Sequence, residues 1–194
     1  MKKKSFTVKT LCMVGIMAAL VFVGTNLRIK IPAGPDGTML HLGNVFCLLG
    51  GLLFGGLPGG LAAGIGSGLF DLMSEYASEA WITFINKFAM GLVAGLVAHL
   101  GAKCAGSEKL RTVLGAICGS LTYCFLYIGK TIVWQRWVYG MPWEGVWPVV
   151  GVKAVVTLVN GLIAVAVSAA LALALRPALR KAKILPPLDE ETGR

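Results

Sequence analysis

Two lysines lie inside long apolar stretches of this sequence and are its clearest candidates for chemistry. Lys87 falls within residues 81–101 and Lys153 within residues 148–175. A charged side chain inside a membrane span costs at least about 2.5 kcal/mol and is by default a candidate for a functional role. Two simpler interpretations stay open, namely snorkelling to the membrane surface and pairing with an acidic residue such as Asp71 or Glu79. Both lysines lie near the same expected end of the molecule.

Aromatic residues are concentrated in one segment, residues 131–147, which is expected to be a loop. Four of the five tryptophans of the chain lie there, and two tyrosines, Tyr123 and Tyr127, precede it. An aromatic belt at a membrane interface is the ordinary explanation. Because a belt would be spread over both membrane faces, we favour a pocket that stacks on a flat heterocyclic ligand. The tryptophans are Trp134, Trp137, Trp143 and Trp147.

The sequence offers little support for catalysis, for a metal site or for a cofactor. The glycine-rich residues 64–68 lack the lysine of a phosphate-binding loop. His41 and His99 are expected at opposite ends of the molecule, and the five cysteines include no CxxC pair. A membrane enzyme would need a cluster of acids and histidines in one plane, which Asp71, Glu75 and Glu79 alone do not supply. We therefore expect no enzyme activity and no cofactor.

The elements that must position these residues are membrane helices. The 194 residues are 56% hydrophobic and only 14% charged, against roughly 25% charged in soluble domains. The net charge of +9 sits mainly at the ends of apolar runs, which argues against a nucleic-acid surface. The first run is longer than the apolar region of a signal peptide, so we interpret it as a helix of the mature protein. A span needs about 20 apolar residues, and an all-α bundle of six spans is predicted within one domain, residues 1–175: 8–27, 39–55, 58–74, 81–101, 110–130 and 148–175.

The distribution of basic residues predicts the orientation of this bundle. With six spans the two ends of the chain share one side, and most lysines and arginines fall there, including those of a polar tail, residues 176–194. Because basic residues favour the cytoplasmic side, we expect both termini in the cytoplasm of a cell in whose plasma membrane the protein lies. The opposite, outer side carries the loops 28–38, 73–80 and 131–147, where a ligand site is expected.

Small residues at four-residue intervals indicate close helix packing. Residues 56, 60, 64 and 68 are all glycine, and Gly15 and Ala19 form a similar flat surface on the first helix. Asn86 and Asn160 are polar residues within spans and need partners inside the bundle. We expect Asn160 to hydrogen-bond a neighbouring helix rather than a ligand.

Several segments resemble the S components, the substrate-binding subunits, of energy-coupling factor (ECF) transporters. They are MLHLGN at 39–44, GGLPGGLAAGIGSGLFD at 55–71, WITF at 81–84 followed by Lys87 and Gly91, and Pro148, Lys153 and Gly161 on the last helix. The resemblance covers about residues 8–175. It implies a six-helix bundle that captures a vitamin or vitamin precursor from outside. It also implies as partners a transmembrane scaffold subunit and two ATPase subunits.

The resemblance also implies where ligand and partner bind. The small residues of helix 1 would contact the scaffold, which maps to Gly15 and Ala19, although the family usually has alanine at both positions. The ligand would lie near the outer face, beneath the loop between helices 1 and 2. The residues that this location implies are His41, Asn44, Glu79, Trp81, Asn86, Lys87, Tyr127, Trp143, Trp147 and Lys153.

Two alternatives stay open at this stage. A self-sufficient transporter or channel often shows paired inverted repeats, and no convincing repeat relates residues 8–74 to residues 81–175. A membrane scaffold without a ligand would have no need for so many aromatic residues in one outer loop. The sequence does not decide the identity or the charge of the ligand.

Overall fold

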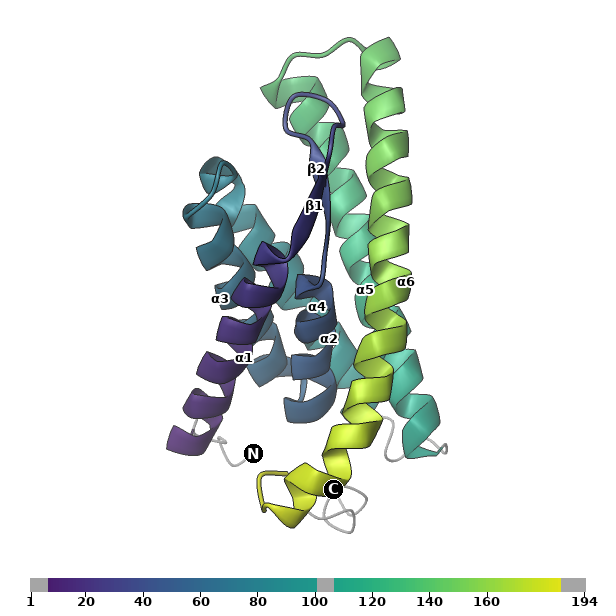
Figure 1. The fold of residues 1–194 in the computed structure, drawn as a ribbon. Coiled ribbons are helices and arrows are strands. Elements are labelled where there is room, and N and C mark those ends of the chain that lie inside the picture. Colours follow the sequence, from purple (N-terminus) through teal and green to yellow (C-terminus); the bar gives the residue numbers. More distant parts are fainter. Residues whose placement is uncertain (1–6, 101–106, 186–194) are drawn as a thin grey trace.

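The computed structural model describes residues 7–100 and 107–185, which form a bundle of α-helices with one short β-hairpin (Figure 1). The hairpin follows the first helix, and it stands at the end of the bundle opposite to the start of α1 and the end of α6. The elements are α1 (Val8–Asn26), β1 (Arg28–Ile31), β2 (Thr38–His41), α2 (Gly43–Phe54), α3 (Gly56–Leu72), η1 (Ala77–Glu79), α4 (Ala80–Leu100), α5 (Glu108–Val133), η3 (Trp134–Val138) and α6 (Trp143–Lys181).

The β-hairpin corrects the prediction that a helix begins at residue 39. Residues 28–31 pair antiparallel with residues 38–41, with Arg28 opposite His41 and Ile31 opposite Thr38. Two glycines in the connecting loop, Gly34 and Gly37, have φ angles of 69° and 60°, which glycine adopts without strain. Helix α2 therefore starts only at residue 43 and has 12 residues.

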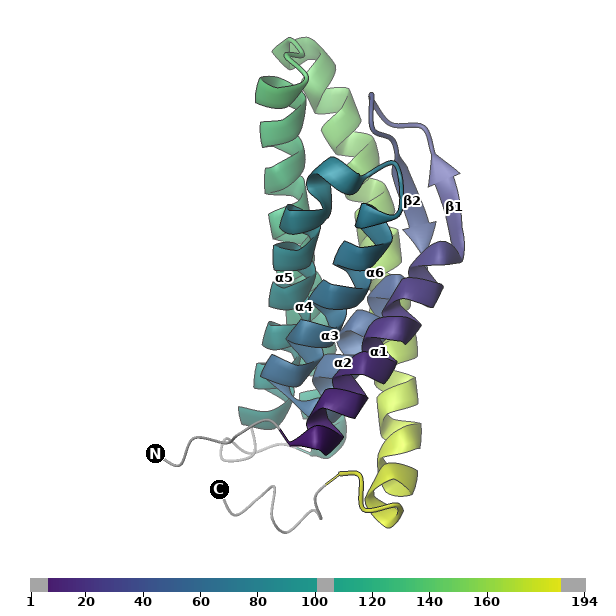
Figure 2. The ribbon, with the colours of Figure 1, turned by 90° about the vertical axis from the view of Figure 1, so that its left-hand side faces the viewer.

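The aromatic segment is also more regular than the predicted loop. Helix α5 continues to residue 133 and passes into one turn of π-helix, η3. The chain then reverses at Gly140, which has a φ of 65°, and α6 begins at residue 143. The helical hairpin of α5 and α6 consequently extends beyond the other helices (Figure 1 and Figure 2). At the other end α6 continues to residue 181, so the first residues of the predicted tail are helical.

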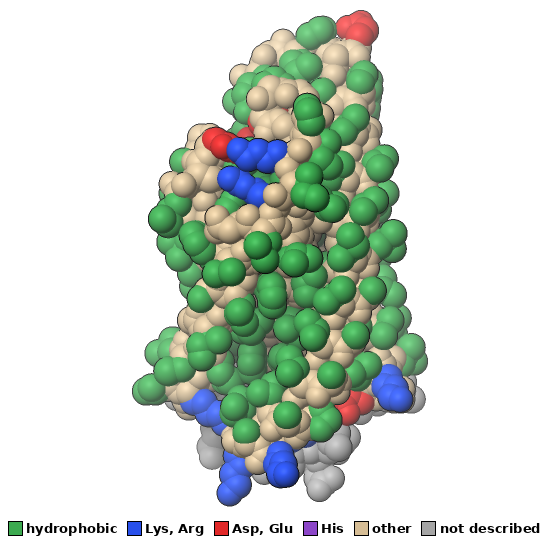
Figure 3. Space-filling view, viewed as in Figure 1, with side chains coloured by type: hydrophobic (Ala, Val, Ile, Leu, Met, Phe, Trp, Pro, Cys, Tyr) green, Lys and Arg blue, Asp and Glu red, His purple; other side chains and the backbone are tan. Residues whose placement is uncertain are grey.

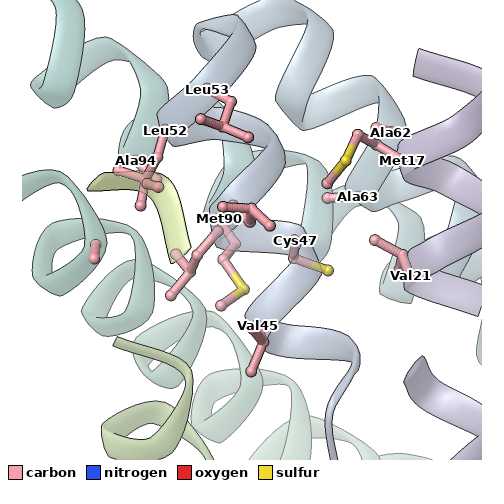
Figure 4. Close-up of a cluster of buried hydrophobic side chains, with 14 of the residues drawn as sticks. Met17, Val21, Val45, Cys47, Leu52, Leu53, Ala62, Ala63, Met90 and Ala94 are labelled. Atoms are coloured by element: carbon pink, nitrogen blue, oxygen red, sulfur yellow. The ribbon is translucent and has the colours of Figure 1, made fainter. Parts of the chain in front are cut away.

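Glycine allows α2, α3 and α4 to pack with their backbones in contact. A β-carbon built on Gly59 of α3 would overlap the backbone of Gly51 in α2, and one on Gly95 of α4 would overlap the backbone of Gly56. Apolar side chains, among them Met17, Val21, Cys47 and Met90, fill the space around these contacts (Figure 4). The tight packing of these three helices gives the cavity described below a fixed base.

We expect Gly59→Val to destabilise the bundle, because the added side chain must displace the backbone of α2. Overpacking of this kind typically costs about 1–3 kcal/mol. Thermal unfolding in detergent, followed by tryptophan fluorescence, would measure the loss. Gly151→Val is the matched control, since a β-carbon at Gly151 meets no atom within 4 Å. Equal unfolding temperatures for the two variants would contradict this account of the packing.

The surface of the molecule fits a lipid environment. Four helices are long and apolar enough to cross a membrane, in the segments 8–26, 77–99, 108–138 and 143–181. Figure 3 shows hydrophobic side chains over the length of one face, with basic groups at the end that holds the start of α1 and the end of α6 and, toward the other end, basic groups beside acidic ones. Lys9 Nζ donates a hydrogen bond to the carbonyl oxygen of Lys183, which joins these two segments. We call this the termini end and the opposite one the hairpin end.

Candidate functional site

A polar cavity lies at the hairpin end, between the β-hairpin and helices α3 to α6. Its wall is unusual for the interior of a membrane bundle because most of the lining side chains carry a polar atom. Elements distant in the sequence supply them, with the hairpin on one side and α4 and α5 on the other. The lining residues are Thr25, Asp36, Gly37, Thr38, Met39, His41, Ser67, Asp71, Tyr76, Glu79, Thr83, Asn86, Lys87, Tyr123, Tyr127, Lys130, Thr157 and Asn160.

A larger vestibule adjoins this cavity on the outer side of the hairpin loop. The vestibule has a volume of about 530 Å³, and the cavity about 70 Å³. Both are lined by residues 36–38 of the hairpin, by Tyr76 and by Glu79, so these residues form the partition between them. Ligand pockets usually measure about 300–1,000 Å³. A vitamin-sized ligand in contact with the cavity wall would therefore extend past these shared residues into the vestibule.

Lys87 lies at the base of the cavity and is only 4% exposed. Its ammonium group donates a hydrogen bond to Asn44 Oδ1 and lies 3.6 Å from the ring centroid of Tyr123. The described residues place no carboxylate within ion-pair distance of this ammonium group. A buried ammonium group with three donors and so few acceptors is suited to receive a hydrogen-bond acceptor from a ligand.

The second lysine of the cavity wall, Lys130 on α5, forms a buried ion pair with Glu79. Glu79 follows the loop after α3 and lies at the partition, where only one of its carboxylate oxygens receives this bond. The other oxygen, Oε1, is buried and has no hydrogen-bond partner among the described residues. An unsatisfied buried acceptor is costly, so this oxygen is a second point where a ligand can bind.

Asp36 ties the hairpin loop to the long helices. Its carboxylate accepts a hydrogen bond of 2.6 Å from Lys153 Nζ on α6 and one of 2.8 Å from Gln135 Nε2 in η3. Lys153 is 1% exposed and does not line the cavity. The structure therefore assigns Lys153 to the ion pair with Asp36, one of the simpler interpretations left open above, although with a different acid from those considered.

Asn160 fixes the second strand of the hairpin to α6. Its side-chain oxygen accepts a bond of 3.1 Å from the backbone N–H of His41, and its nitrogen donates one of 2.9 Å to the carbonyl of Met39. The expected helix–helix bond is thus replaced by a helix–hairpin bond. His41 Nδ1 in turn accepts from the backbone N–H of Gly43, where α2 begins. Both residues also line the cavity.

The mouth of the vestibule carries charged and polar groups that face water. Lys30 of β1 and Glu75 of the loop after α3 form an exposed ion pair of 2.8 Å. The hydrogen bond from Lys30 lowers the pKa of Glu75 below its usual value, so this carboxylate is ionised at neutral pH. Burial raises the pKa of Tyr76 to about 12. The Tyr76 hydroxyl consequently stays neutral and can donate a hydrogen bond at the partition.

The structure brings together half of the ligand-binding residues expected from the sequence. The cavity is lined by His41, Glu79, Asn86, Lys87 and Tyr127. Asn44 and Lys153 do not line it, but each is hydrogen-bonded to a residue that does, Asn44 to Lys87 and Lys153 to Asp36. The three tryptophans of that set lie elsewhere on the surface. Trp81 is 59% exposed, and Trp143 and Trp147 stack on each other with ring centroids 5.9 Å apart. The aromatic residues of the cavity wall are tyrosines, Tyr76, Tyr123 and Tyr127.

Three site residues escaped the sequence analysis. Asp36 was assigned to a loop of turn residues, and Lys130 and Gln135 were placed at a helix end and in a loop. Charge balance could have identified Asp36, since two buried lysines require acids at the same end of the bundle. In the described structure Lys130 and Gln135 are both buried, 9% and 0% exposed.

The helix bundle and its lipid-compatible surface are those of a multi-pass membrane protein, and the polar cavity at one end has lining groups suited to a small solute. Residues 5–177 match the family model of the ECF-type riboflavin transporter, S component. The chain therefore belongs to this family of transporter components, which are not enzymes. A solved structure described as the S component of a bacterial ECF transporter aligns with a TM-score of 0.59 and 19% identity, covering 86% of this chain and 97% of that chain. This likeness shows the fold. No curated protein matches the sequence.

Proposed function

We propose that this protein is the riboflavin-binding subunit of an ATP-driven ECF importer and that the cavity at the hairpin end receives the vitamin from outside the cell. The observation that carries the proposal is the buried Lys87, which faces a cavity within the described bundle without a carboxylate partner. The ring system of riboflavin is flat and carries carbonyl oxygens that accept hydrogen bonds. The tyrosines of the cavity wall offer ring faces for contact with it.

The proposal includes a topology of six spans with both termini in the cytoplasm. Basic residues support it, because Lys9, Lys109, Arg111, Arg180 and Lys181 all lie at the termini end, against a single described acid, Glu108. Helices α2 and α3 have 12 and 17 residues and are shorter than a usual span. The hairpin lengthens the α2 segment toward the outer surface, so this pair can still cross the membrane together.

The experiment that tests the function is riboflavin binding to the protein purified in detergent. Native mass spectrometry should find one riboflavin molecule per chain, either retained from the host cell or added. Titration of riboflavin, followed by quenching of its fluorescence, should reach saturation at the same ratio. A folded protein that retains no flavin and gives no quenching would contradict the proposal and would favour the transporter, channel or scaffold alternatives.

Helix α1 is the proposed contact for the scaffold subunit of the module, which would associate with two ATPase subunits. Gly15 and Ala19 lie on its exposed face, and a β-carbon at Gly15 meets no atom within 4 Å. This smooth strip is suited to close approach of a second helix.

We expect the double substitution Gly15→Leu and Ala19→Leu to prevent co-purification with the scaffold and ATPase subunits while riboflavin binding is unchanged. Bulky side chains would hold the partner helix away, and neither position lines the cavity. Pull-down from membranes that contain the whole complex would measure the loss. Gly129→Leu is the control, since Gly129 on α5 is equally unobstructed. Retention of the partners by the double variant would remove this face from the interface.

A further inference from the structure

The turn that follows α6 brings three lysines together at the termini end. It is a Schellman motif, in which the N–H of Ile184 donates a hydrogen bond of 2.8 Å to the carbonyl oxygen of Leu179. The motif directs the chain back toward the start of α1 (Figure 1), where Lys9 Nζ donates a hydrogen bond to the carbonyl oxygen of Lys183. Lys9, Lys181 and Lys183 consequently form one exposed group, which we call the lysine cluster.

The fold holds the lysine cluster together although its charges repel one another. Lys183 has a φ of 56°, a backbone conformation that is uncommon for residues other than glycine. Lys9 lies in the first turn of α1, where the helix dipole disfavours a positive charge. Both features oppose the arrangement, so a compensating negative charge would stabilise it.

The described part of the chain supplies no such charge. Within residues 7–100 and 107–185, no carboxylate lies at ion-pair distance from any member of the lysine cluster. The single described acid of the termini end, Glu108, is already bound by Arg176 at 2.9 Å and by Arg180 at 3.0 Å. The lysine cluster is therefore open to an anion from outside the described chain.

An exposed apolar strip on α1 begins directly beside the lysine cluster. Residues at i, i+4, i+7 and i+11 lie on one face of a helix, and counted from Lys9 they are Met13, Ile16 and Leu20. Ile16 is 63% exposed and Leu20 is 38% exposed. A ligand that fits both surfaces has an anionic group for the lysines and a long apolar chain for the strip. A free phosphate ion would satisfy only the first.

We propose that the lysine cluster binds the phosphate headgroup of an anionic phospholipid, whose acyl chain lies along the apolar strip of α1. The inference goes beyond the proposed function and requires no bound flavin. A basic residue near an anionic membrane surface contributes about fivefold to the affinity. The lysine cluster should therefore prefer an anionic lipid to a zwitterionic one that has the same acyl chains.

The test is native mass spectrometry of the full-length protein in detergent, titrated with phosphatidylglycerol or with phosphatidylcholine of identical acyl chains. We expect the anionic lipid to bind at least about 25-fold more tightly. An excess of glycerol 3-phosphate should not displace it, because this compound makes no contact with the apolar strip. Equal binding of the two lipids would overturn the inference. Displacement by glycerol 3-phosphate would assign the lysine cluster to a soluble phosphate instead.

A pair of double variants locates the site. Lys9→Gln with Lys181→Gln should weaken phosphatidylglycerol binding about 25-fold, and Lys181→Gln alone about fivefold, which keeps the test decisive if the double variant does not fold. Lys109→Gln with Arg111→Gln is the matched control, since it removes the same charge from the same end but on α5. An equal loss in the control would show that the lipid responds to the general charge of this end and would refute a site at the lysine cluster.

The other candidate occupant of the lysine cluster is the acidic stretch of this chain at 189–191. Replacing its acids with amides, by Asp189→Asn, Glu190→Gln and Glu191→Gln, should leave the preference for phosphatidylglycerol unchanged. If the unaltered protein shows no preference and this variant gains one, the acidic stretch occupies the cluster and the proposal fails.

Discussion

Lys87→Met should lower the affinity for riboflavin by about 100-fold, the equivalent of roughly 2.7 kcal/mol. A hydrogen bond to a charged group contributes about 1.5–3 kcal/mol, and the substitution removes the only ammonium group at the base of the cavity that is free of an ion pair among the described residues. Methionine is similar in length, so the shape of the cavity changes little. Fluorescence titration with riboflavin would measure the loss.

The same substitution should leave the stability of the empty protein nearly unchanged. A buried ammonium group without a carboxylate is expensive to desolvate, and replacing it by an apolar side chain removes this cost. The loss of the bond to Asn44 acts in the opposite direction. A large fall in unfolding temperature would show that Lys87 holds the bundle together rather than binds the ligand. Lys30→Met, at the exposed mouth, is the matched control and should change neither quantity appreciably.

The helical bundle and the approximate places of most helices were predictable from the sequence, since the apolar runs indicate them. The hairpin around residue 39 and the helical turns within residues 131–147 were not. Lys87 could be identified from the cost of burying its charge. The ion-pair partner of Lys153 could not be predicted, because this partner, Asp36, lies 117 residues away in a turn-rich loop. Only the β-hairpin brings the two together, and four-residue strands amid glycine and proline give no distinct periodicity.

The tryptophans show a second limit of prediction from the sequence. Their concentration in one segment is evident from the sequence, but composition does not indicate whether their side chains face the cavity or the surface. Residues 134–147 form a π-helical turn, a reversal and the start of α6 at the tip of a helical hairpin, where Trp137 is 67% exposed. With Trp143 and Trp147 also on the surface, these rings fit the interfacial belt that was the ordinary explanation. The cavity takes its aromatic surface from tyrosines on α5 and after α3.

Arg176→Met should produce the largest loss of stability, about 3 kcal/mol or more, because it removes three hydrogen bonds from a charged donor and leaves a buried carbonyl and a buried hydroxyl without that partner. Arg176 lies at the termini end of α6 and is 7% exposed. It donates hydrogen bonds of 2.9 Å to Glu108, 2.7 Å to Thr112 and 2.8 Å to the carbonyl oxygen of Leu52. The last of these is one of the carbonyl groups that the end of α2 leaves without a helical partner. One side chain therefore joins α6 to both α5 and α2.

Unfolding in mixed detergent with increasing sodium dodecyl sulfate would measure this loss of stability. Riboflavin titration of the folded fraction should give the wild-type affinity, since Arg176 does not line the cavity. Lys181→Met, one turn further along the same helix and exposed, is the control and should have little effect. Arg176→Lys should fall between them, because lysine keeps the charge but cannot reach all three acceptors in the same planar geometry. If Arg176→Met unfolds like the control, α6 is held by its apolar contacts alone. If instead its affinity for riboflavin falls with its stability intact, the two ends of the bundle are coupled through α6.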